Sequence, residues 1–132
     1  MKLDRFESKA EAIDYLISEG KFSKRTEAEK YLQKCVPQEK AYQKKIIDHL
    51  KKKYPKAYVW KAAAGPYSRG GVPDIIAVID CRFYGFEVKR PYFGEASELQ
   101  KDAIRKINAA GGFAGVVCFP EDVEKIIERS KA

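Results

Sequence analysis

Two acidic residues and one lysine stand near the middle of this chain at a spacing suited to metal chemistry. Asp74 precedes the apolar run Ile75–Ile79, and the next segment ends with Glu87, Val88 and Lys89. Because side chains alternate along a β-strand, Glu87 and Lys89 would project from one face, with Cα atoms roughly 6.5 Å apart. Two carboxylates and one ammonium in so small a volume are suited to bind a hard cation.

The other metal-binding residue types narrow the choice of cation. Cys35, Cys81 and Cys118 are widely spaced without a CxxC pair, and His49 is the single histidine. This pattern excludes a disulfide framework and a zinc cluster built from His and Cys. A metal would therefore be held by oxygen ligands, which indicates Mg²⁺, Mn²⁺ or Ca²⁺.

Hydrophobic periodicity and capping sequences predict the elements that would position these residues. Strands are expected over residues 58–63, 75–79, 83–89 and 113–119, and helices over residues 38–53, from 97 to the glycines at 111 and 112, and from 120 onward. The continuous apolar run at 75–79 is typical of a central strand covered on both faces. A β-α-β step requires a right-handed crossover, so we expect an α/β fold with a mixed sheet flanked by helices.

Two of these helices carry further candidate residues. Glu39 lies only about 20° from the apolar stripe of its helix, which directs it inward. A first-turn carboxylate is also favoured by the helix dipole alone, although a charge on the core face requires a partner. Gln100 completes a capping box that Ser97 begins. The inner face of that helix is expected to consist of Leu99, Ala103, Ile104 and Ile107.

The N-terminal residues 1–36 predict a pair of short helices outside the main domain at 37–132. Capping boxes at Ser8–Glu11 and Thr26–Glu29 mark their starts, and Gly20 and Pro37 their ends. Such a pair is typical of a packing or dimerisation appendage, which we favour over a DNA-binding helix-turn-helix.

Charge is concentrated in one part of the 132-residue chain. Residues 21–61 hold thirteen Lys or Arg against four Asp or Glu, whereas residues 62–132 are balanced. A basic region with interspersed aromatic residues fits a polyphosphate partner, although a lysine-rich solvated helix gives the same pattern. No GK[ST] or GxGxxG loop is present, so a nucleotide cofactor is not expected.

Taken together, these residues resemble the PD-(D/E)XK nuclease superfamily, and within it the VRR-Nuc family of compact phage and bacterial endonucleases. The matching motifs are Gly71-Val-Pro-Asp74, Glu87-Val-Lys89, the helix-borne Gln100 and Glu39. The resemblance covers about residues 38–119. It implies a restriction-endonuclease-like αβββαβ core, to which residues 1–36 would be added.

The resemblance also implies roles for these residues. Asp74 and Glu87, with the backbone carbonyl of Val88, would hold Mg²⁺, for which Mn²⁺ can substitute, and Glu39 would complete a first or second metal site. Lys89 would orient the attacking water or stabilise developing charge. Gln100 would position Lys89 or the scissile phosphate, or would serve only the capping box.

Candidates for contact with DNA follow from their positions. Lys61 lies near the end of the first strand, and Lys44 and Lys45 lie in the basic helix. Tyr67, Ser68 and Arg69 precede the Asp74 motif in a glycine-rich loop. All of these residues would equally suit a solvated surface.

We therefore expect an intracellular, Mg²⁺-dependent DNA endonuclease without a membrane segment, acting through water attack. Through the resemblance we further expect structured DNA, such as Holliday junctions or flaps, as substrate and a homodimer as the working form. An archaeal-type Holliday junction resolvase is the first alternative. A non-catalytic DNA-binding module is the alternative from another class.

Overall fold

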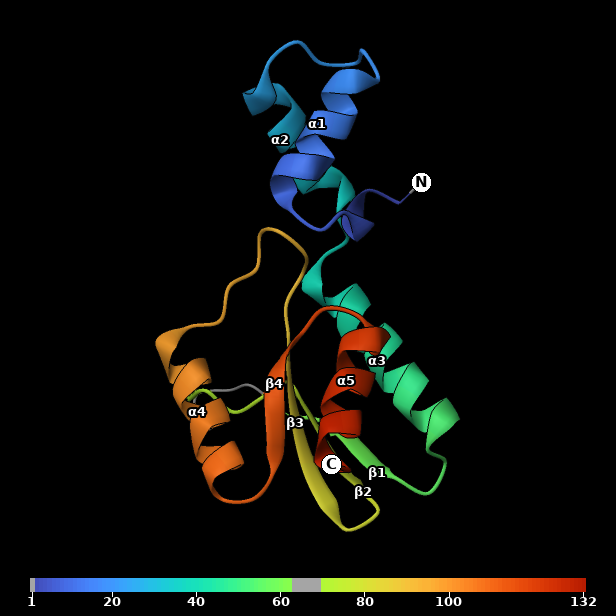
Figure 1. Cartoon of the computed structure of the whole chain (residues 1–132), viewed down its shortest axis with the longest axis vertical. Helices are drawn as coiled ribbons and strands as arrows, with labels where there is room; N and C mark the ends of the chain where they lie inside the picture. The colour runs from blue at the N-terminus through green and yellow to red at the C-terminus, as the bar shows by residue number, and fades with distance from the viewer. Residues whose placement is uncertain (1, 63–69) are drawn as a thin grey trace. The chain divides into compact units, whose positions relative to one another are not determined.

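The computed structural model describes residues 2–62 and 70–132 of the chain. It divides into two compact units, one of residues 1–38 with 90–94 and one of residues 39–89 with 95–132. The first unit carries η1 (Leu3–Arg5), α1 (Lys9–Ser18) and α2 (Arg25–Cys35). The second carries α3 (Glu39–Lys53), β1 (Tyr58–Lys61), β2 (Ile75–Ile79), β3 (Arg82–Val88), α4 (Glu98–Ala109), β4 (Phe113–Val117) and α5 (Pro120–Ser130), as Figure 1 shows.

The larger unit is built on a four-stranded sheet in the order β1-β2-β3-β4. β1 pairs with β2 and β2 with β3 in antiparallel fashion, whereas β3 and β4 are parallel. The parallel pair is joined through α4, as a β-α-β crossover requires. The expected α/β fold with a mixed sheet is thus confirmed, and the strands lie within two residues of the predicted bounds.

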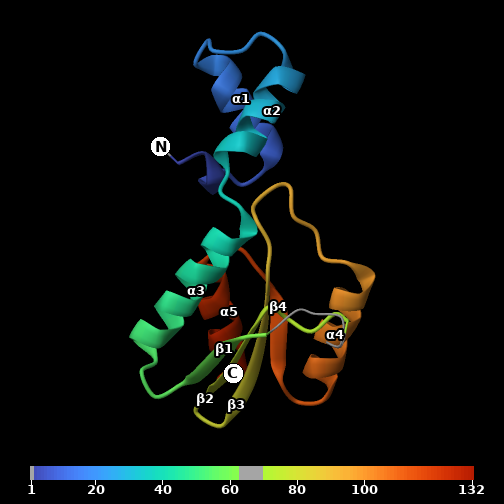
Figure 2. The same cartoon turned by 180° about the vertical axis from the view of Figure 1, so that it is seen from behind.

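Helices cover the two faces of this sheet unequally. On one face α3 and α5 pack together, and the Tyr84 hydroxyl lies 2.6 Å from the Ser130 hydroxyl of α5. On the other face α4 packs against β3 and β4, where Gly85 leaves room for Ile107. Figure 2 shows the same layers from behind. Among the described residues, α4 has no contact of comparable extent with β1 or β2, so no described helix covers that half of its face of the sheet.

The expected inner face of α4 is wrong in part. None of its residues is buried, and Leu99 is 65% exposed at the start of the helix. Ala103, Ile104 and Ile107 are half-buried. The apolar stripe of α4 therefore faces the sheet, but the sheet buries it only in part.

The smaller unit confirms the expected pair of helices but not both of their caps. α1 and α2 pack through Ala12, Leu16, Ala28 and Leu32, all of which are buried. The Ser8 hydroxyl accepts the Glu11 amide as predicted. The capping box at Thr26 is wrong, because α2 begins at Arg25 with Lys24 as its N-cap, which places Thr26 inside the first turn.

Residues 90–94 belong to the smaller unit although they follow β3 in the chain. The Tyr92 hydroxyl accepts the amide of Phe6 at 2.9 Å and lies within hydrogen-bond distance of the carbonyls of Leu3 and Phe6. The sequence did not predict this insertion, since 90–94 carries no element of its own. Among the described residues, no helix combines the length and the apolar character that a membrane span needs.

Candidate active site

Asp74 and Glu87 lie opposite each other where β2 begins and β3 approaches its end. The last antiparallel pair is Ile75 with Phe86, so the next position places Asp74 beside Glu87 on one face. Cβ atoms of such directly opposed residues are about 4.5–5.5 Å apart. The Val88 amide donates to Asp74 Oδ2 at 2.9 Å, which holds the Asp74 side chain toward β3.

Glu87 is a buried carboxyl group whose charge is not balanced by hydrogen bonds. It is 1% exposed, and neither of its carboxylate oxygens has a hydrogen-bond partner among the described residues. Burial, and next the neighbouring Asp74 carboxylate, raise the pKa of Glu87 to about 9, whereas Lys89 acts in the opposite direction. Two facing carboxylates can bond to each other only through a proton. The carboxylates of Asp74, Glu87 and Glu39 share only the Lys89 ammonium, so their full ionisation needs further positive charge.

Lys89 and Glu39 form the other side of this cluster. Lys89 Nζ lies 3.9 Å from Glu87 Oε2 and 3.7 Å from Glu39 Oε1, and its side chain is only 14% exposed. Glu39 is the first residue of α3 and points toward β3, so the partner that its inward position requires is Lys89. The ammonium is thereby held between two carboxylates rather than in solvent.

Gln43 belongs to the cluster although we did not include it among the candidate residues. It is 6% exposed, and its Nε2 lies 3.3 Å from Glu39 Oε2. Its own Oε1 is buried without a hydrogen-bond partner in the described structure. The signal that would have found it is the i,i+4 spacing from Glu39 together with its place in the apolar stripe of α3.

The Val88 backbone is oriented toward Asp74. In an extended strand the N–H and C=O of one residue point to the same side. Because the Val88 N–H is bonded to Asp74, the Val88 carbonyl faces the same side of β3. The Lys89 amide points the other way and donates to the Val117 carbonyl of β4 at 2.9 Å.

Gln100 forms the predicted capping box at the start of α4. Its Oε1 accepts the Ser97 amide at 2.8 Å, and its own amide donates to the Ser97 hydroxyl at 3.2 Å. The helix start lies against the loop that leads to Asp74, because a Cβ on Gly71 would be only 2.4 Å from the Leu99 carbonyl. The backbone of Leu99 and Gln100 therefore lies close to the loop that leads to Asp74.

The donor set at the site suits a hard divalent cation held by two carboxylates. Within residues 2–62 and 70–132, no three His, Cys, Asp or Glu side chains gather as a ready metal-binding group. The pair that does converge is Asp74 with Glu87, and Glu39 approaches it by way of Lys89. The buried Glu87 oxygens without donors, together with the oxygen-only chemistry, fit Mg²⁺ or Mn²⁺.

Comparison with known proteins gives the fold a name. No protein-family model matches the sequence, and no curated protein is significantly similar to it. A solved structure described as "VRR_NUC domain" matches with a TM-score of 0.53 and 22% sequence identity, covering 68% of this chain and 94% of that one. The chain has the fold of a VRR_NUC domain. At 22% sequence identity the likeness shows the fold, and the activity depends on the residues of the site.

On this VRR_NUC fold the expected DNA contacts are only partly described. Lys61 is exposed at the end of β1 and pairs with Ile75, next to Asp74. Lys44 and Lys45 are exposed on α3, where Lys44 is paired with Asp48 at 2.9 Å. The other expected contacts, Tyr67, Ser68 and Arg69, lie outside the described residues.

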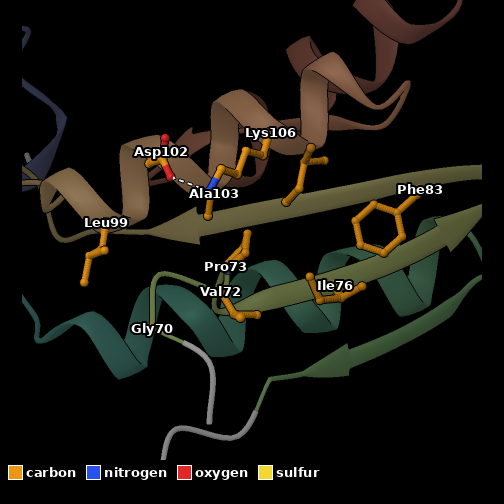
Figure 3. Close-up of a pocket in the computed structure, with 10 residues that line it drawn as sticks. Gly70, Val72, Pro73, Ile76, Phe83, Leu99, Asp102, Ala103 and Lys106 are labelled. Carbon is orange, nitrogen blue, oxygen red and sulfur yellow. Dashed lines mark ion pairs between the residues drawn. The ribbon is translucent and has the colours of Figure 1, made fainter.

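A groove lies beside the site on the α4 side of the sheet. Figure 3 shows Val72, Pro73, Ile76 and Phe83 facing α4 across it, with Asp102 and Lys106 paired at its edge at 2.9 Å. Its volume is about 340 Å³. Among the described residues, strand register places the exposed apolar side chains of Tyr58, Trp60, Val78, Phe83 and Val116 on the same side of the sheet. Val72 and Leu99, which are also exposed, line the groove there.

Proposed function

We propose that this protein is a metal-dependent DNA endonuclease that hydrolyses phosphodiester bonds with Asp74 and Glu87 as its metal ligands. The observation that carries the proposal is the buried Glu87 carboxyl, which faces Asp74 and lacks a hydrogen-bond donor among the described residues. Its place on a VRR_NUC fold supports the same reading. Mg²⁺ is the expected cation, and Mn²⁺ can substitute for it.

Each residue of the cluster has a distinct part in this mechanism. A cation bound here would supply Lewis acidity toward the phosphate and would lower the pKa of a water molecule. Asp74, Glu87 and the Val88 carbonyl would hold it, and Lys89 would orient the water and offset negative charge on the phosphoryl oxygens. One P–O bond forms to the water oxygen while the opposite P–O bond breaks, and the departing oxygen takes up a proton.

In this proposal Glu39 and Gln43 hold the Lys89 side chain in position. Glu39 forms an ion pair with the Lys89 ammonium at 3.7 Å, and Gln43 restrains the Glu39 carboxylate from within α3. This arrangement limits the positions open to the Lys89 side chain. With Glu87 engaged as a metal ligand, Glu39 would be the carboxylate that holds the Lys89 ammonium near the reacting phosphate. A direct role of Glu39 in a second metal site is the alternative arrangement.

Gln100 and the basic residues would contact the nucleic acid. The capping box uses Oε1 and the backbone amide of Gln100, which leaves its Nε2 to donate to the scissile phosphate. Lys61, Lys44 and Lys45 are exposed cations for the phosphate backbone. Tyr67, Ser68 and Arg69 complete the proposed contacts from the sequence alone.

We propose structured DNA as the substrate and a homodimer as the working form, so that two sites can act on two strands. The apolar side chains gathered on the α4 side of the sheet support self-association. Tyr58, Trp60 and Phe83 are 70%, 38% and 40% exposed, which leaves on the order of 300 Å² of aromatic surface in water if each side chain has about 200 Å². With the neighbouring aliphatic residues this surface approaches the half-interface of a stable dimer.

The test is nicking of supercoiled plasmid and of synthetic four-way junctions, flaps and plain duplex. We expect cleavage with Mg²⁺ or Mn²⁺, none with EDTA, and a loss of at least about 100-fold in Glu87→Ala and Asp74→Ala. Glu98→Ala is the matched control, since Glu98 is an exposed carboxylate at the start of α4. Activity that persists in EDTA or in Glu87→Ala would overturn the proposal.

The same substrates separate the alternatives. Paired symmetric cuts on the four-way junction, without cleavage of flaps and duplex, would favour the resolvase. Salt-sensitive DNA binding that is unaffected by metal or by Asp74→Ala, without cleavage, would favour a non-catalytic binding module.

A further inference from the structure

The positive charge of the larger unit comes from one stretch of its chain. Residues 39–61, which include α3 and β1, contain eight lysines against the two acids Glu39 and Asp48. In the remainder of this unit, nine basic residues stand against ten acidic ones. The attraction of the larger unit for a polyanion must therefore arise from residues 39–61.

The lysines of α3 gather on its solvent side. The buried side chains of this helix lie on one side, as their spacing of three or four residues requires. At 100° per residue, five exposed lysines fall within about 140° of arc on the opposite side. They form the α3 lysine face, which consists of Lys40, Lys44, Lys45, Lys51 and Lys52. Lys53 falls outside this arc and is paired with Glu124 of α5.

The α3 lysine face is neutralised only in small part by the protein itself. Asp48 is the single acidic residue on that side of α3, and it pairs with Lys44 at 2.9 Å. The other four lysines of the face have no ion pair with a described residue. Charges of one sign held close together repel each other, and an anionic partner would relieve this repulsion.

The α3 lysine face begins beside the candidate active site. Glu39, the first residue of α3, lies 3.7 Å from Lys89 Nζ, and Lys40 follows it directly. From Lys40 to Lys52 the helix rises by about 18 Å. This length corresponds to about five base pairs of duplex DNA at 3.4 Å each.

The chemistry of this face favours double-stranded over single-stranded DNA. Surfaces that bind single strands combine basic residues with exposed aromatic side chains, on which unpaired bases stack. Tyr42 is the aromatic residue within α3, and it is only 1% exposed, so the lysine face has no such platform. It offers positive charge alone, which suits the regularly spaced phosphates of a duplex.

We propose that the α3 lysine face binds the phosphate backbone of a duplex arm next to the position of cleavage. The inference rests on the proposed function, because the DNA that occupies the site determines where the arm lies. It adds a requirement for the substrate, which is at least about five base pairs of duplex on one side of the scissile phosphate. Lys40, Lys51 and Lys52 thereby join Lys44 and Lys45 as phosphate contacts.

The experiment measures DNA binding in EDTA by fluorescence anisotropy at increasing salt concentration. The probes are a duplex of about 20 base pairs and a single strand of the same length. We expect Lys51→Ala/Lys52→Ala to reduce the slope of log K against log salt by about 2 for the duplex and to raise its Kd several-fold. Binding of the single strand should change little.

Lys125→Ala/Arg129→Ala is the matched control. It also removes two exposed cations, but from α5, which contains four acidic residues. The control should keep the wild-type slope, and both variants should keep the far-UV circular dichroism of wild type because alanine favours helix. An unchanged slope in Lys51→Ala/Lys52→Ala would overturn the inference. An equal reduction in the control, or an equal loss of single-strand binding, would do the same.

Cleavage assays distinguish the failure of this inference from the failure of the proposed function. We expect Lys51→Ala/Lys52→Ala to raise KM for DNA with kcat kept, because the contact is the same in the ground state and the transition state. A chain that binds duplex through the α3 lysine face but cleaves no DNA would reject only the proposed function. A chain that cleaves DNA, with wild-type KM in Lys51→Ala/Lys52→Ala, would reject only the inference.

Discussion

In the proposed metal site, Glu87 is a residue that gives up stability for binding. A carboxyl group that is 1% exposed and without donors in the described structure is costly to ionise. Its pKa of about 9 means that the metal-free protein holds a proton there at neutral pH. A divalent cation would displace this proton, so metal binding and proton release are coupled at the site.

The raised pKa predicts a pH dependence of stability. An unfolded Glu titrates near 4.5, whereas folded Glu87 titrates near 9, so between these values the folded state binds more protons. Its contribution is fully present below about pH 4.5 and is lost as pH rises through 9. We therefore expect Tm in EDTA to fall less from pH 5 to pH 9 in Glu87→Gln than in wild type.

Thermal unfolding followed by circular dichroism at several pH values in EDTA measures this difference. Glu98→Gln serves as the control and is expected to follow wild type, because Glu98 is exposed. Identical pH profiles of Glu87→Gln and wild type would show that Glu87 is already ionised in the metal-free protein.

Gln100 offers a second test at the residue scale. A Glu at this position still accepts the Ser97 amide, as capping boxes use Glu and Gln alike, but it cannot donate to a phosphate. We expect Gln100→Glu to keep the thermal stability and to lower nicking about tenfold or more. Ser97→Ala is the converse variant, with stability lowered by about 1 kcal/mol and nicking per folded molecule kept. Equal nicking by Gln100→Glu and wild type would assign Gln100 to the cap alone.

At the scale of elements, the loop before β2 and the start of α4 are fitted together at Gly71. This glycine has φ +86°, and the Leu99 carbonyl occupies the place of a Cβ. Both facts exclude a side chain, so the backbone of α4 can approach the loop that carries Asp74. The start of α4 and Asp74 are therefore expected to shift together.

Gly71→Ala is predicted to destabilise the protein and to reduce nicking. Gly20→Ala is the matched control: Gly20 has φ +77° in the smaller unit, with nothing within 4 Å of a Cβ. The control should lose about 1 kcal/mol from backbone strain, and Gly71→Ala should lose more because strain and overlap add. Urea unfolding and plasmid nicking measure the two effects. Equal losses would mean that the contact with Leu99 yields at no cost.

At one position of the β4 edge, the Asn108 side chain takes the place of a neighbouring strand. Asn108 on α4 donates to the Ala114 carbonyl at 3.1 Å and accepts the Ala114 amide at 2.8 Å, which occupies both hydrogen-bonding groups of that strand residue. Such a contact discourages pairing with another strand. Association through the α4 side of the sheet is therefore expected to use its apolar face rather than this edge.

At the scale of the whole molecule, the apolar face predicts a measurable self-association. Trp60 is the single tryptophan and lies on this face, 38% exposed. We expect its emission to shift to the blue as protein concentration rises, in step with the dimer fraction from sedimentation velocity. Val78→Lys, at 38% exposure on the same face, should abolish both changes.

Tyr31→Lys is the control for this prediction, because Tyr31 has a similar exposure of 37% but lies in the smaller unit. It should associate as wild type does. A wild-type chain that stays monomeric at high concentration, or a Val78→Lys variant that still dimerises, would reject this face as the dimer interface.

The sequence by itself determined the elements and their order, because these depend on local periodicity and capping. The apolar run at Ile75–Ile79, the stripe of α3 and the Ser97 box each carry their signal within a few residues. The alternation around Glu87 also places that residue and Lys89 on one face, because it depends only on the two-residue period of a strand. These features, and the resemblance built on them, were sufficient to predict the fold.

Only the tertiary structure decided which groups meet. The contacts of Lys89 with Glu39, of Arg90 with α2 and of Gly71 with Leu99 join segments far apart in the chain. The partial burial of the apolar stripe of α4 likewise depends on how the helix packs on the sheet. Local patterns cannot report such contacts, because burial and ion pairing depend on what another part of the chain brings to the same place.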